Sequence, residues 1–298
     1  MRKLLIQLDS SPHPSVFDRV VAYDGGADEV LSYGGVTEEA VRDLVHGAIF
    51  TRGPKDLHHT AIFIGGTDMA VGERLLRKVT KTFFGPMRVS VMLDSNGSNT
   101  TAVAAVSRLQ QAVGDVAGLR ALVTAGSGPV GLRAAGLLVR AGASMTVTSR
   151  RAGDGAIAAA IQTRFAESVA ASVIRGTIRE VAMADASQAA SALEGMHLVL
   201  NAGPAGACLI PRAAWAGRPG LRAAADLNAV PPLGIEGIEV MDDAVERDGA
   251  IVFGALGVGS LKMKIHKACI ARLFERNDLV LDAETIAEVA LELTTRRP

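Results

Sequence analysis

Six residues near the middle of the chain have the types and spacing needed to bind phosphate groups. They are Gly126-Ser127-Gly128-Pro129-Val130-Gly131, a G-x-G-x-x-G sequence. An apolar run over 121–125 precedes them, apolar residues at helical spacing follow over 130–141, and a second apolar run covers 145–148. This order predicts a strand, a glycine turn, a helix and a second strand. Such a unit is typical of dinucleotide binding, because the pyrophosphate lies against the amide groups at the helix N-terminus.

Each glycine has a predicted role. Gly126 allows a tight turn out of the strand, Gly128 lets a pyrophosphate approach the backbone, and Gly131 lets the helix lie close to the sheet. Ser127, Pro129 and Val130 complete the predicted phosphate-binding loop. The chain contains 32 glycines, so an ordinary glycine-rich turn remains the alternative interpretation.

The residues after the second strand indicate which dinucleotide is bound. Ser149, Arg150 and Arg151 stand where an NAD-binding protein usually carries a carboxylate for the ribose hydroxyl. Arginine pairs with a 2′-phosphate, and a serine hydroxyl adds a donor. The sequence therefore predicts NADP as the cofactor, with a solvated basic loop as the alternative.

Two later loops are candidates for contact with the nicotinamide half of the cofactor. Ala202 and Gly203 follow a predicted strand over 197–200, although a purely structural turn would have the same sequence. Asn228 lies in a proline-stiffened loop over 226–234, which follows another predicted strand and suits one wall of a cleft.

The first hundred residues predict a separate α/β domain, because apolar runs over 3–8, 29–33, 60–64 and 89–93 alternate with helical patterns. Ser15 and Asp18 resemble a capping box for a helix with Val16, Val20 and Val21 on its buried face. The polar segment over 94–101 follows the last of these strands. It is interpreted either as part of a ligand site or as an Asn96-Gly97 turn before a capped helix.

A helix is predicted from Ser260, after a glycine-rich segment over 254–259. Lys262 then falls in the first turn, where the helix dipole disfavours a cation. This position favours contact with an anion or a substrate, with a solvated lysine as the alternative.

Composition limits the remaining possibilities. The 298 residues include 31 basic and 31 acidic side chains, and this balance argues against nucleic-acid binding. Two cysteines without metal-ligand spacing predict neither a disulfide framework nor a metal site. With no apolar segment of membrane-spanning length and no signal peptide, we expect a cytoplasmic protein without a membrane partner. The predicted fold is α/β with two domains. The first covers 1–102, joined by the C-terminal helix over 275–298, and the second is a doubly wound Rossmann-type domain over 103–274.

Several longer strings are similar to one known family. They are YDGGAD at 23–28, FFGP at 83–86, LDSNGSNTT at 93–101, AVPPLG at 229–234 and GALGVGSLKMK at 254–264. The chain resembles the NADP-dependent methylene-tetrahydromethanopterin dehydrogenases of C1-metabolising bacteria over nearly its whole length. Whether it resembles a strictly methanopterin-dependent branch, or one that also accepts tetrahydrofolate, stays open.

The resemblance implies an active site in a cleft between a pterin-binding domain and the Rossmann domain. It implies hydride transfer from the methylene carbon of a C1 carrier to NADP, giving the methenyl carrier and NADPH. Lys262 resembles the family's active-site lysine, with a role in positioning the pterin, and Asp18 is the candidate for its compensating carboxylate. The further candidates for substrate contact are Phe17, Asp94, Ser98, Asn99 and Thr100. A homo-oligomer is expected.

Three rival functions remain open at this point. The first is a bifunctional folate dehydrogenase–cyclohydrolase, which would also hydrolyse the methenyl product. The second is a non-catalytic NADP sensor on the same scaffold, since a fold alone does not determine function. The third is a dehydrogenase for a small hydroxy acid or shikimate-like substrate, which would need an acid–base pair near the nicotinamide.

Overall fold

The computed structural model describes residues 1–150, 155–167 and 175–295, with only the backbone described for 165–167. The chain forms two compact units, one of residues 1–100 with 263–298 and the other of residues 101–262. Residues 263–274, which the sequence analysis places with the cofactor domain, pack in the first unit.

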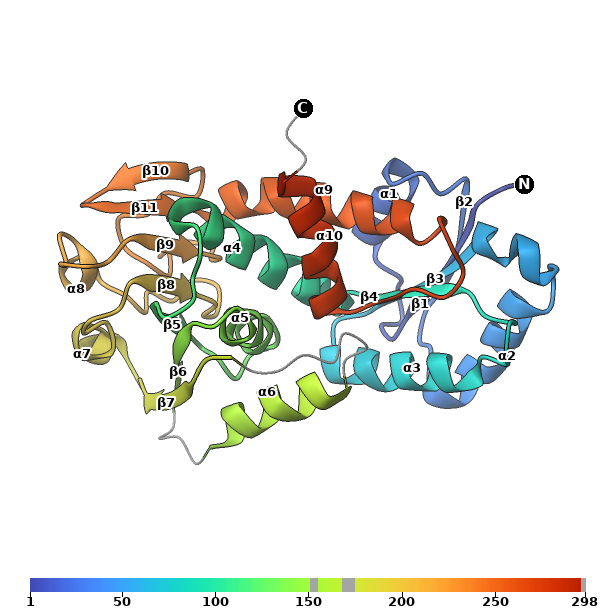
Figure 1. The fold of residues 1–298 in the computed structure, drawn as a ribbon, viewed down its shortest axis with the longest axis horizontal. Helices are drawn as coiled ribbons and strands as arrows, with labels where there is room; N and C mark the ends of the chain where they lie inside the picture. Colours follow the sequence, from blue (N-terminus) through green and yellow to red (C-terminus); the bar gives the residue numbers. More distant parts are fainter. Residues whose placement is uncertain (151–154, 168–174, 296–298) are drawn as a thin grey trace. The chain divides into compact units, whose positions relative to one another are not determined.

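The first unit contains a parallel sheet of five strands in the order β12-β4-β3-β1-β2 (Figure 1). Its strands are β1 (Leu4–Asp9), β2 (Glu29–Tyr33), β3 (Thr60–Gly65), β4 (Ser90–Leu93) and β12 (Val280–Leu281). Its helices are α1 (Val16–Asp24), α2 (Glu38–Ile49), α3 (Met69–Thr82) and α10 (Ala283–Thr295), with short 3₁₀ turns η1 (Pro54–His59) and η2 (Ser95–Gly97).

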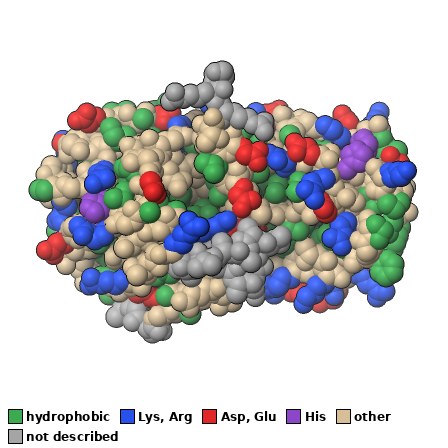
Figure 2. All heavy atoms as spheres, in the orientation of Figure 1, with side chains coloured by type: hydrophobic (Ala, Val, Ile, Leu, Met, Phe, Trp, Pro, Cys, Tyr) green, Lys and Arg blue, Asp and Glu red, His purple; other side chains and the backbone are tan. Residues whose placement is uncertain are grey.

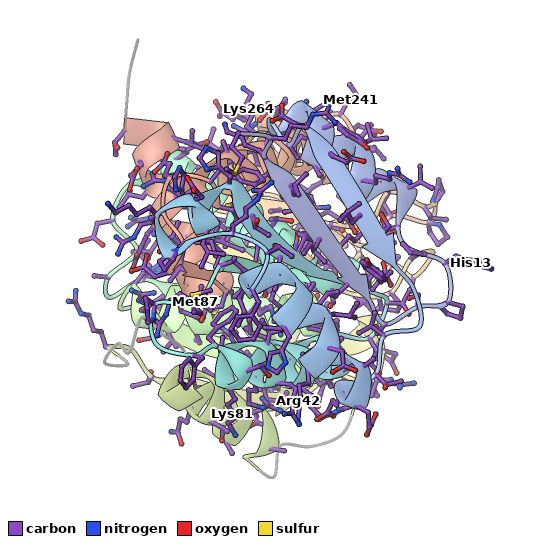
Figure 3. The ribbon with its side chains drawn as sticks, turned by 90° about the vertical axis from the view of Figure 1, so that its right-hand side faces the viewer. His13, Arg42, Lys81, Met87, Met241 and Lys264 are labelled. Carbon is purple, nitrogen blue, oxygen red and sulfur yellow. The ribbon has the colours of Figure 1, made fainter. Side chains whose placement is uncertain are left out.

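The core of this unit explains why β3 reads as a continuous apolar run. All six residues of β3 are buried, as expected for a strand covered on both faces of a parallel sheet. On one face, Ile62 belongs to a buried cluster with Val45 of α2 and Leu75 of α3. Arg42 and Lys81, on the exposed sides of α2 and α3, are labelled on this side of the unit in Figure 3.

The C-terminal segment completes the same sheet. Val280 of β12 pairs with Val91 of β4, and the Ser90 hydroxyl donates to the carbonyl of Arg276 over 2.7 Å. The following helix α10 begins with a reciprocal cap, because the Thr285 amide donates to Oδ1 of Asp282 while the Asp282 amide donates to Oγ1 of Thr285.

The second unit contains a sheet of seven strands in the order β10-β11-β9-β8-β5-β6-β7 (Figure 1), parallel except that β10 is antiparallel to β11. Its strands are β5 (Arg120–Thr124), β6 (Ser144–Ser149), β7 (Ile178–Ala182), β8 (Leu198–Asn201), β9 (Ala223–Asp226), β10 (Asp243–Arg247) and β11 (Ala250–Phe253). Helices α5 (Pro129–Arg140), α6 (Ala156–Glu167), α7 (Ala189–Ala192) and α8 (Arg212–Trp215) belong to it, with the 3₁₀ turn η3 (Ala186–Gln188). Helices α4 (Ser98–Val113) and α9 (Ala255–Arg272) each contribute residues to both units.

This strand order is that of a doubly wound dinucleotide-binding sheet, with its switch point between β5 and β8. The α/β class with a Rossmann-type sheet, predicted from the alternation of apolar runs, is therefore confirmed.

Two helices differ from their predictions. The predicted buried face of α1 is wrong for Val16 and Val20, which are 75% and 53% exposed. Val21 is buried as predicted, together with Ala22. Helix α9 starts at Ala255, five residues before Ser260. The glycines in its first turns suggested a loop, yet a Cβ on Gly257 would lie only 2.0 Å from the carbonyl oxygen of Asp242. Gly257 therefore permits close packing and does not break the helix, whereas a Cβ on Gly259 would meet nothing within 4 Å.

Basic and acidic side chains are interspersed on the surface turned to the viewer in Figure 2, as the equal numbers of the two charges suggest. Among the helices in the described part of the chain, each is too short or too polar to cross a membrane.

Candidate functional site

The G-x-G-x-x-G segment forms a tight loop from β5 into α5. The amide of Gly126 donates to the carbonyl of Thr148 over 2.8 Å, which ties the loop to β6. A Cβ on Gly126 would lie 2.9 Å from Cβ of Val147, and one on Gly131 would lie 2.6 Å from the carbonyl oxygen of Ala125. Both positions therefore require glycine because the loop, helix and sheet approach so closely.

The left-handed residue of this loop is Ala125, with φ of 51°, and not the predicted turn residue Gly126. Gly128 is the N-cap of α5 and Pro129 its first residue. Because Gly128 has no side chain, it leaves the first amides of α5 open to an anion. The binding of a pyrophosphate by these amides, beside Ser127 and Val130, stays a prediction.

The predicted 2′-phosphate reader lies at the end of β6. Ser149 is the last residue of that strand, and the side chain of Arg150, which follows it, is exposed. Arg151 lies outside the described residues. An exposed guanidinium directly beyond the strand next to the glycine loop is placed to pair with a phosphate on the adenosine ribose.

Three buried side chains connect the carboxyl ends of β5, β8 and β9. The Thr124 hydroxyl donates to Oδ1 of Asn201 over 2.5 Å, and Nδ2 of Asn201 donates to Oδ1 of Asp226 over 2.7 Å. Asn201 is fully buried, and its Oδ1 also accepts from the amide of Gly203. This set of hydrogen bonds was not predicted from the sequence. Its only signal there was a polar residue at the end of each of three apolar strands.

Asn228 holds two loops together beside these three hydrogen-bonded side chains. It is 4% exposed, and its Oδ1 accepts from the amides of Val230 and Gly206. Its Nδ2 donates to the carbonyls of Pro204 and Pro232. Asn228 therefore shapes the wall of the predicted nicotinamide site, while Ala202 and Gly203 form the loop that this wall supports.

Lys262 lies on α9, which starts earlier than the sequence predicts. The residue is in the third turn and not the first, so the disfavoured position at the N-terminus does not apply. Its side chain is partly buried. One turn further along, at the spacing that places residues on one helix face, is His266, which is fully buried.

His266 lies in an aromatic and acidic environment within the first unit. Its ring stacks on Phe63 of β3 with centroids 5.6 Å apart, and the ring of Phe17 is tilted against it at 6.4 Å. Its Nδ1 is 4.0 Å from Oδ2 of Asp94. Phe17 itself is 49% exposed, so one side of this predicted substrate-binding residue is open to a ligand.

The polar loop after β4 is engaged in starting α4. Oδ1 of Asp94 accepts from the amides of Asn99 and Thr100 over 2.9 and 3.0 Å, and Oδ2 accepts from the Thr100 hydroxyl over 2.6 Å. Nδ2 of Asn99 donates to the carbonyl of Leu93. Ser98 is fully buried, and its hydroxyl has no hydrogen-bond partner among the described residues. The interpretation as a capped helix therefore describes this loop, and Asp94, Ser98, Asn99 and Thr100 are all buried.

Asp18 lies at the carboxyl edge of the first sheet. A Cβ on Gly65, the last residue of β3, would be 3.0 Å from Oδ2 of Asp9 and 3.6 Å from Oδ2 of Asp18. Half of the predicted capping box is present, since Oγ of Ser15 accepts from the Asp18 amide. The Ser15 amide donates to Oδ2 of Asp9, so capping does not depend on the Asp18 carboxylate.

A family model and two relatives of known name all point to the same family of proteins. Residues 16–96 match the family model described as methylene-tetrahydromethanopterin dehydrogenase, N-terminal. The chain is 48% identical over 98% of its length, and over 99% of the relative, to a protein of Methylorubrum extorquens named "Bifunctional protein MdtA". It is 29% identical, over 98% of its length and 99% of the relative, to the NAD(P)-dependent methylenetetrahydromethanopterin dehydrogenase of the same organism.

Two solved structures share the fold. A shikimate 5-dehydrogenase from Listeria monocytogenes, in complex with shikimate and NAD, aligns with a TM-score of 0.56 at 14% identity, covering 97% of this chain and 96% of that one. A shikimate dehydrogenase in complex with NADP+ aligns with a TM-score of 0.51 at 13% identity, covering 99% and 96%.

The fold and the glycine loop together define a two-unit α/β protein with a Rossmann-type sheet. The sequence identity to its relatives, over nearly the whole length of both chains, determines the family. The chain belongs to the methylene-tetrahydromethanopterin dehydrogenase family.

Proposed function

We propose that this protein transfers a hydride from 5,10-methylene-tetrahydromethanopterin to NADP, giving the 5,10-methenyl carrier and NADPH. The observation that carries the proposal is the near full-length relationship to this family, at 48% identity over 98% of the chain. The geometry of the glycine loop and the position of Arg150 agree with it.

The cofactor residues fit NADP. The amides around Gly126, Gly128 and Gly131 receive the pyrophosphate at the start of α5. The space beside Gly128 is open to it, because a Cβ there would have only the Ala125 carbonyl near it. Arg150 and Ser149, with Arg151, pair with the 2′-phosphate. The loop at Ala202 and Gly203, held by Asn201 and Asn228, positions the nicotinamide half. NADP itself supplies the hydride acceptor when it is bound.

The reaction requires alignment more than proton transfer. The hydride leaves a carbon bonded to two nitrogens, and the resulting amidinium cation is stabilised by resonance. The protein therefore has to hold the donor carbon and the acceptor at near-contact distance, which is a proximity effect.

We assign direct contact with the pterin to Lys262, Asp18 and Phe17. A lysine cation beside a forming cation opposes the reaction, so the Asp18 carboxylate is assigned the compensating charge. The polar atoms of Asp94, Asn99 and Thr100 are engaged in capping α4, so these residues shape the pterin site and do not contact the carrier.

Initial rates test the proposal. We expect turnover with NADP and methylene-tetrahydromethanopterin, and much slower turnover with NAD. Tight NADP binding without turnover on this carrier or on methylene-tetrahydrofolate would leave the sensor interpretation in place of the enzyme. Because one relative is named bifunctional, the assay should include methylene-tetrahydrofolate and hydrolysis of the methenyl product. Equal rates on both carriers would identify a dual-carrier enzyme.

A further inference from the structure

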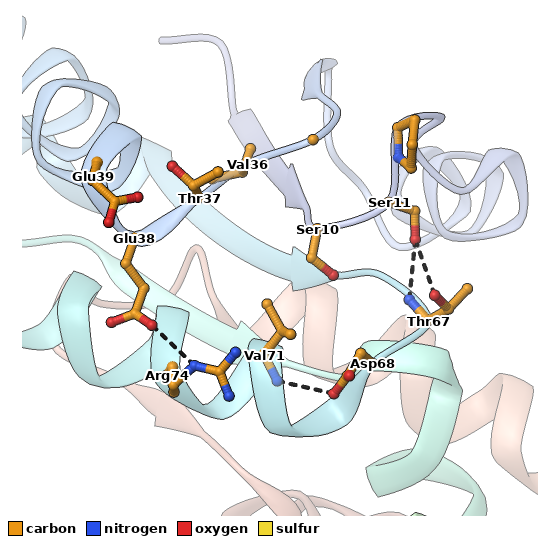
Figure 4. A pocket seen from close by; sticks show the side chains of 12 residues that line it. Ser10, Ser11, Val36, Thr37, Glu38, Glu39, Thr67, Asp68, Val71 and Arg74 are labelled. Atoms are coloured by element: carbon orange, nitrogen blue, oxygen red, sulfur yellow. Dashed lines mark hydrogen bonds and ion pairs between the residues drawn. The ribbon is translucent and has the colours of Figure 1, made fainter.

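Polar side chains lie at the carboxyl ends of the parallel strands in both units, but they differ in how far a ligand can reach them. In the first unit, Ser10 and Thr67 help to line a pocket of about 650 Å³ (Figure 4). In the second unit, Thr124, Asn201 and Asp226 are each at most 1% exposed. This buried set can therefore act on a ligand only through its charge or through the loops that it holds.

The carboxylate of Asp226 accepts hydrogen bonds from uncharged groups. Its Oδ1 accepts from Nδ2 of Asn201 over 2.7 Å and from the Asn228 amide over 3.1 Å. Its Oδ2 accepts from the Ile235 amide over 2.9 Å. In the described part of the chain, no ion pair joins Asp226 to a lysine, arginine or histidine. The negative charge is therefore solvated by amide groups without being neutralised.

A second buried carboxylate in this unit is compensated differently. Asp242 is 4% exposed, and its two oxygens accept from Nε and Nη2 of Arg247, each over 2.6 Å. A buried charge is costly unless a cation or a sufficient set of hydrogen bonds compensates for it. The three hydrogen bonds to Asp226 lower that cost but leave its charge in place. Asp226 is thus a source of negative potential at the carboxyl end of β9.

This charge lies directly behind the loop to which the nicotinamide half is assigned. Asn201 connects the two, because its Nδ2 donates to Asp226 while its Oδ1 accepts from the Gly203 amide over 3.2 Å. Its strand β8 is the first beyond the switch point, where a dinucleotide crosses a doubly wound sheet. The backbone closes over the pair, since a Cβ on Gly234 would lie 1.7 Å from Nδ2 of Asn201 and 2.7 Å from Oδ1 of Asp226. Solvent therefore screens the charge only weakly.

We propose that Asp226 selects the oxidised form of the cofactor over the reduced form. The inference rests on the proposed function. The nicotinamide ring carries a positive charge in NADP+ and none in NADPH, so a fixed negative charge behind its loop favours binding of the oxidised form alone. The protein then binds the hydride acceptor in preference to the product, and NADPH inhibits it less. Because Asp226 acts from behind Asn201, it determines specificity without touching the cofactor.

Asp226→Asn tests the charge, because it keeps the size of the side chain and removes the negative charge. Calorimetric titration with NADP+ and with NADPH, in the absence of any C1 carrier, gives two dissociation constants that do not depend on turnover. We expect the ratio of Kd for NADPH to Kd for NADP+ to fall about tenfold, through weaker binding of NADP+. In steady-state kinetics, the ratio of the NADPH inhibition constant to KM for NADP+ should fall by the same factor.

Thr124→Val is the matched control. It removes the hydrogen bond from the Thr124 hydroxyl to Oδ1 of Asn201 within the same buried set, and it changes no charge. Any loosening of the loop should weaken binding of NADP+ and NADPH equally, so the ratio should not change. Asp226→Ser is a second variant without the charge, and its smaller side chain keeps a hydroxyl acceptor. It is titrated in the same way if thermal unfolding shows that Asp226→Asn does not fold.

The outcomes separate this inference from the proposed reaction. An unchanged ratio in a folded variant without the charge would overturn the role of Asp226, even with normal turnover of the methylene carrier. A fall of equal size in Thr124→Val would also overturn it, because the effect would then come from the loop and not from the charge. The expected fall in a protein that does not turn over the carrier would overturn the proposed reaction and leave the role of Asp226 standing.

Discussion

At the scale of single residues, Lys262 is the side chain on which the proposed chemistry depends most. Lys262→Met should lower kcat/KM for the C1 carrier about 100-fold, because a pterin that is not held in place loses alignment with the hydride acceptor. The dissociation constant for NADP should not change. Steady-state kinetics and NADP titration measure the two effects.

Lys264→Met is the control for this prediction. Lys264 lies on the same helix and is exposed, so its loss should leave kcat/KM within twofold of the unmodified enzyme. Equal rates for the Lys262 and Lys264 variants would show that Lys262 does not position the pterin.

Arg150 determines the choice of cofactor in the proposed site. Arg150→Ala should raise KM for NADP about 10- to 100-fold, since a charge-assisted contact to the 2′-phosphate is lost, and should leave KM for NAD unchanged. Arg179→Ala, an exposed arginine on the neighbouring strand β7, is the control. An equal change in KM for both cofactors would contradict a phosphate-reading role.

At the scale of the elements, the start of α4 is stabilised by one buried carboxylate. Asp94→Ala should reduce the free energy of unfolding by about 2–3 kcal/mol, because it removes the cap and leaves buried amides unsatisfied. Asp68→Ala, which removes the exposed cap of α3, should cost only about 1 kcal/mol. Urea unfolding measures both, and a smaller loss for Asp94→Ala than for Asp68→Ala would refute the capping role.

The segment before β10 contains a carboxylate whose contribution depends on pH. Burial raises the pKa of Asp242. Hydrogen bonds from Arg247 and the Glu239 amide, together with the charge of Arg247, lower it by more than burial raises it, so the pKa lies below the ordinary 3.8. Asp242 therefore stabilises the folded state fully above about pH 4, and this contribution is lost as the pH falls through the lowered pKa.

Asp242→Asn should accordingly lower the unfolding free energy at pH 7, and the difference from the unmodified protein should shrink below pH 4. Urea unfolding at pH 7 and pH 3 checks this expectation. A difference of constant size across that range would mean that the ionised pair with Arg247 contributes nothing.

Helix α9 shows how an element can contradict its local sequence. The glycines at 254, 257 and 259 predict a loop, because glycine is a poor helix former. In the structure the missing side chain of Gly257 lets the helix approach the backbone of Asp242, and Nη2 of Arg108 donates to the Gly257 carbonyl over 3.1 Å. Packing outweighs helix propensity here, and it moves Lys262 out of the first turn.

At the scale of the whole molecule, the C-terminal segment completes a sheet that begins at the N-terminus. Removing residues 275–298 would delete β12 and α10 and expose the edge of β4. It would also expose the side chains that now pack against the buried Leu281, Ile286 and Ala290. An uncovered edge strand promotes aggregation. We expect the truncated chain to be insoluble or to elute as aggregate in gel filtration. The full-length variant Leu291→Gln, at a 62% exposed site, should stay soluble. A soluble truncated chain with unchanged thermal stability would contradict this prediction.

The local sequence was sufficient for the class of fold and the cofactor loop. Apolar runs alternating with helical patterns indicate parallel α/β domains, and the spacing of Gly126, Gly128 and Gly131 indicates a dinucleotide site, because both signals arise within about thirty residues. Only the tertiary structure assigned Asp94 to capping, placed residues 263–274 with the first unit, and joined Thr124 to Asn201 across 77 positions of the sequence. Such contacts depend on strand order and close packing, which neighbouring residues along the chain do not specify.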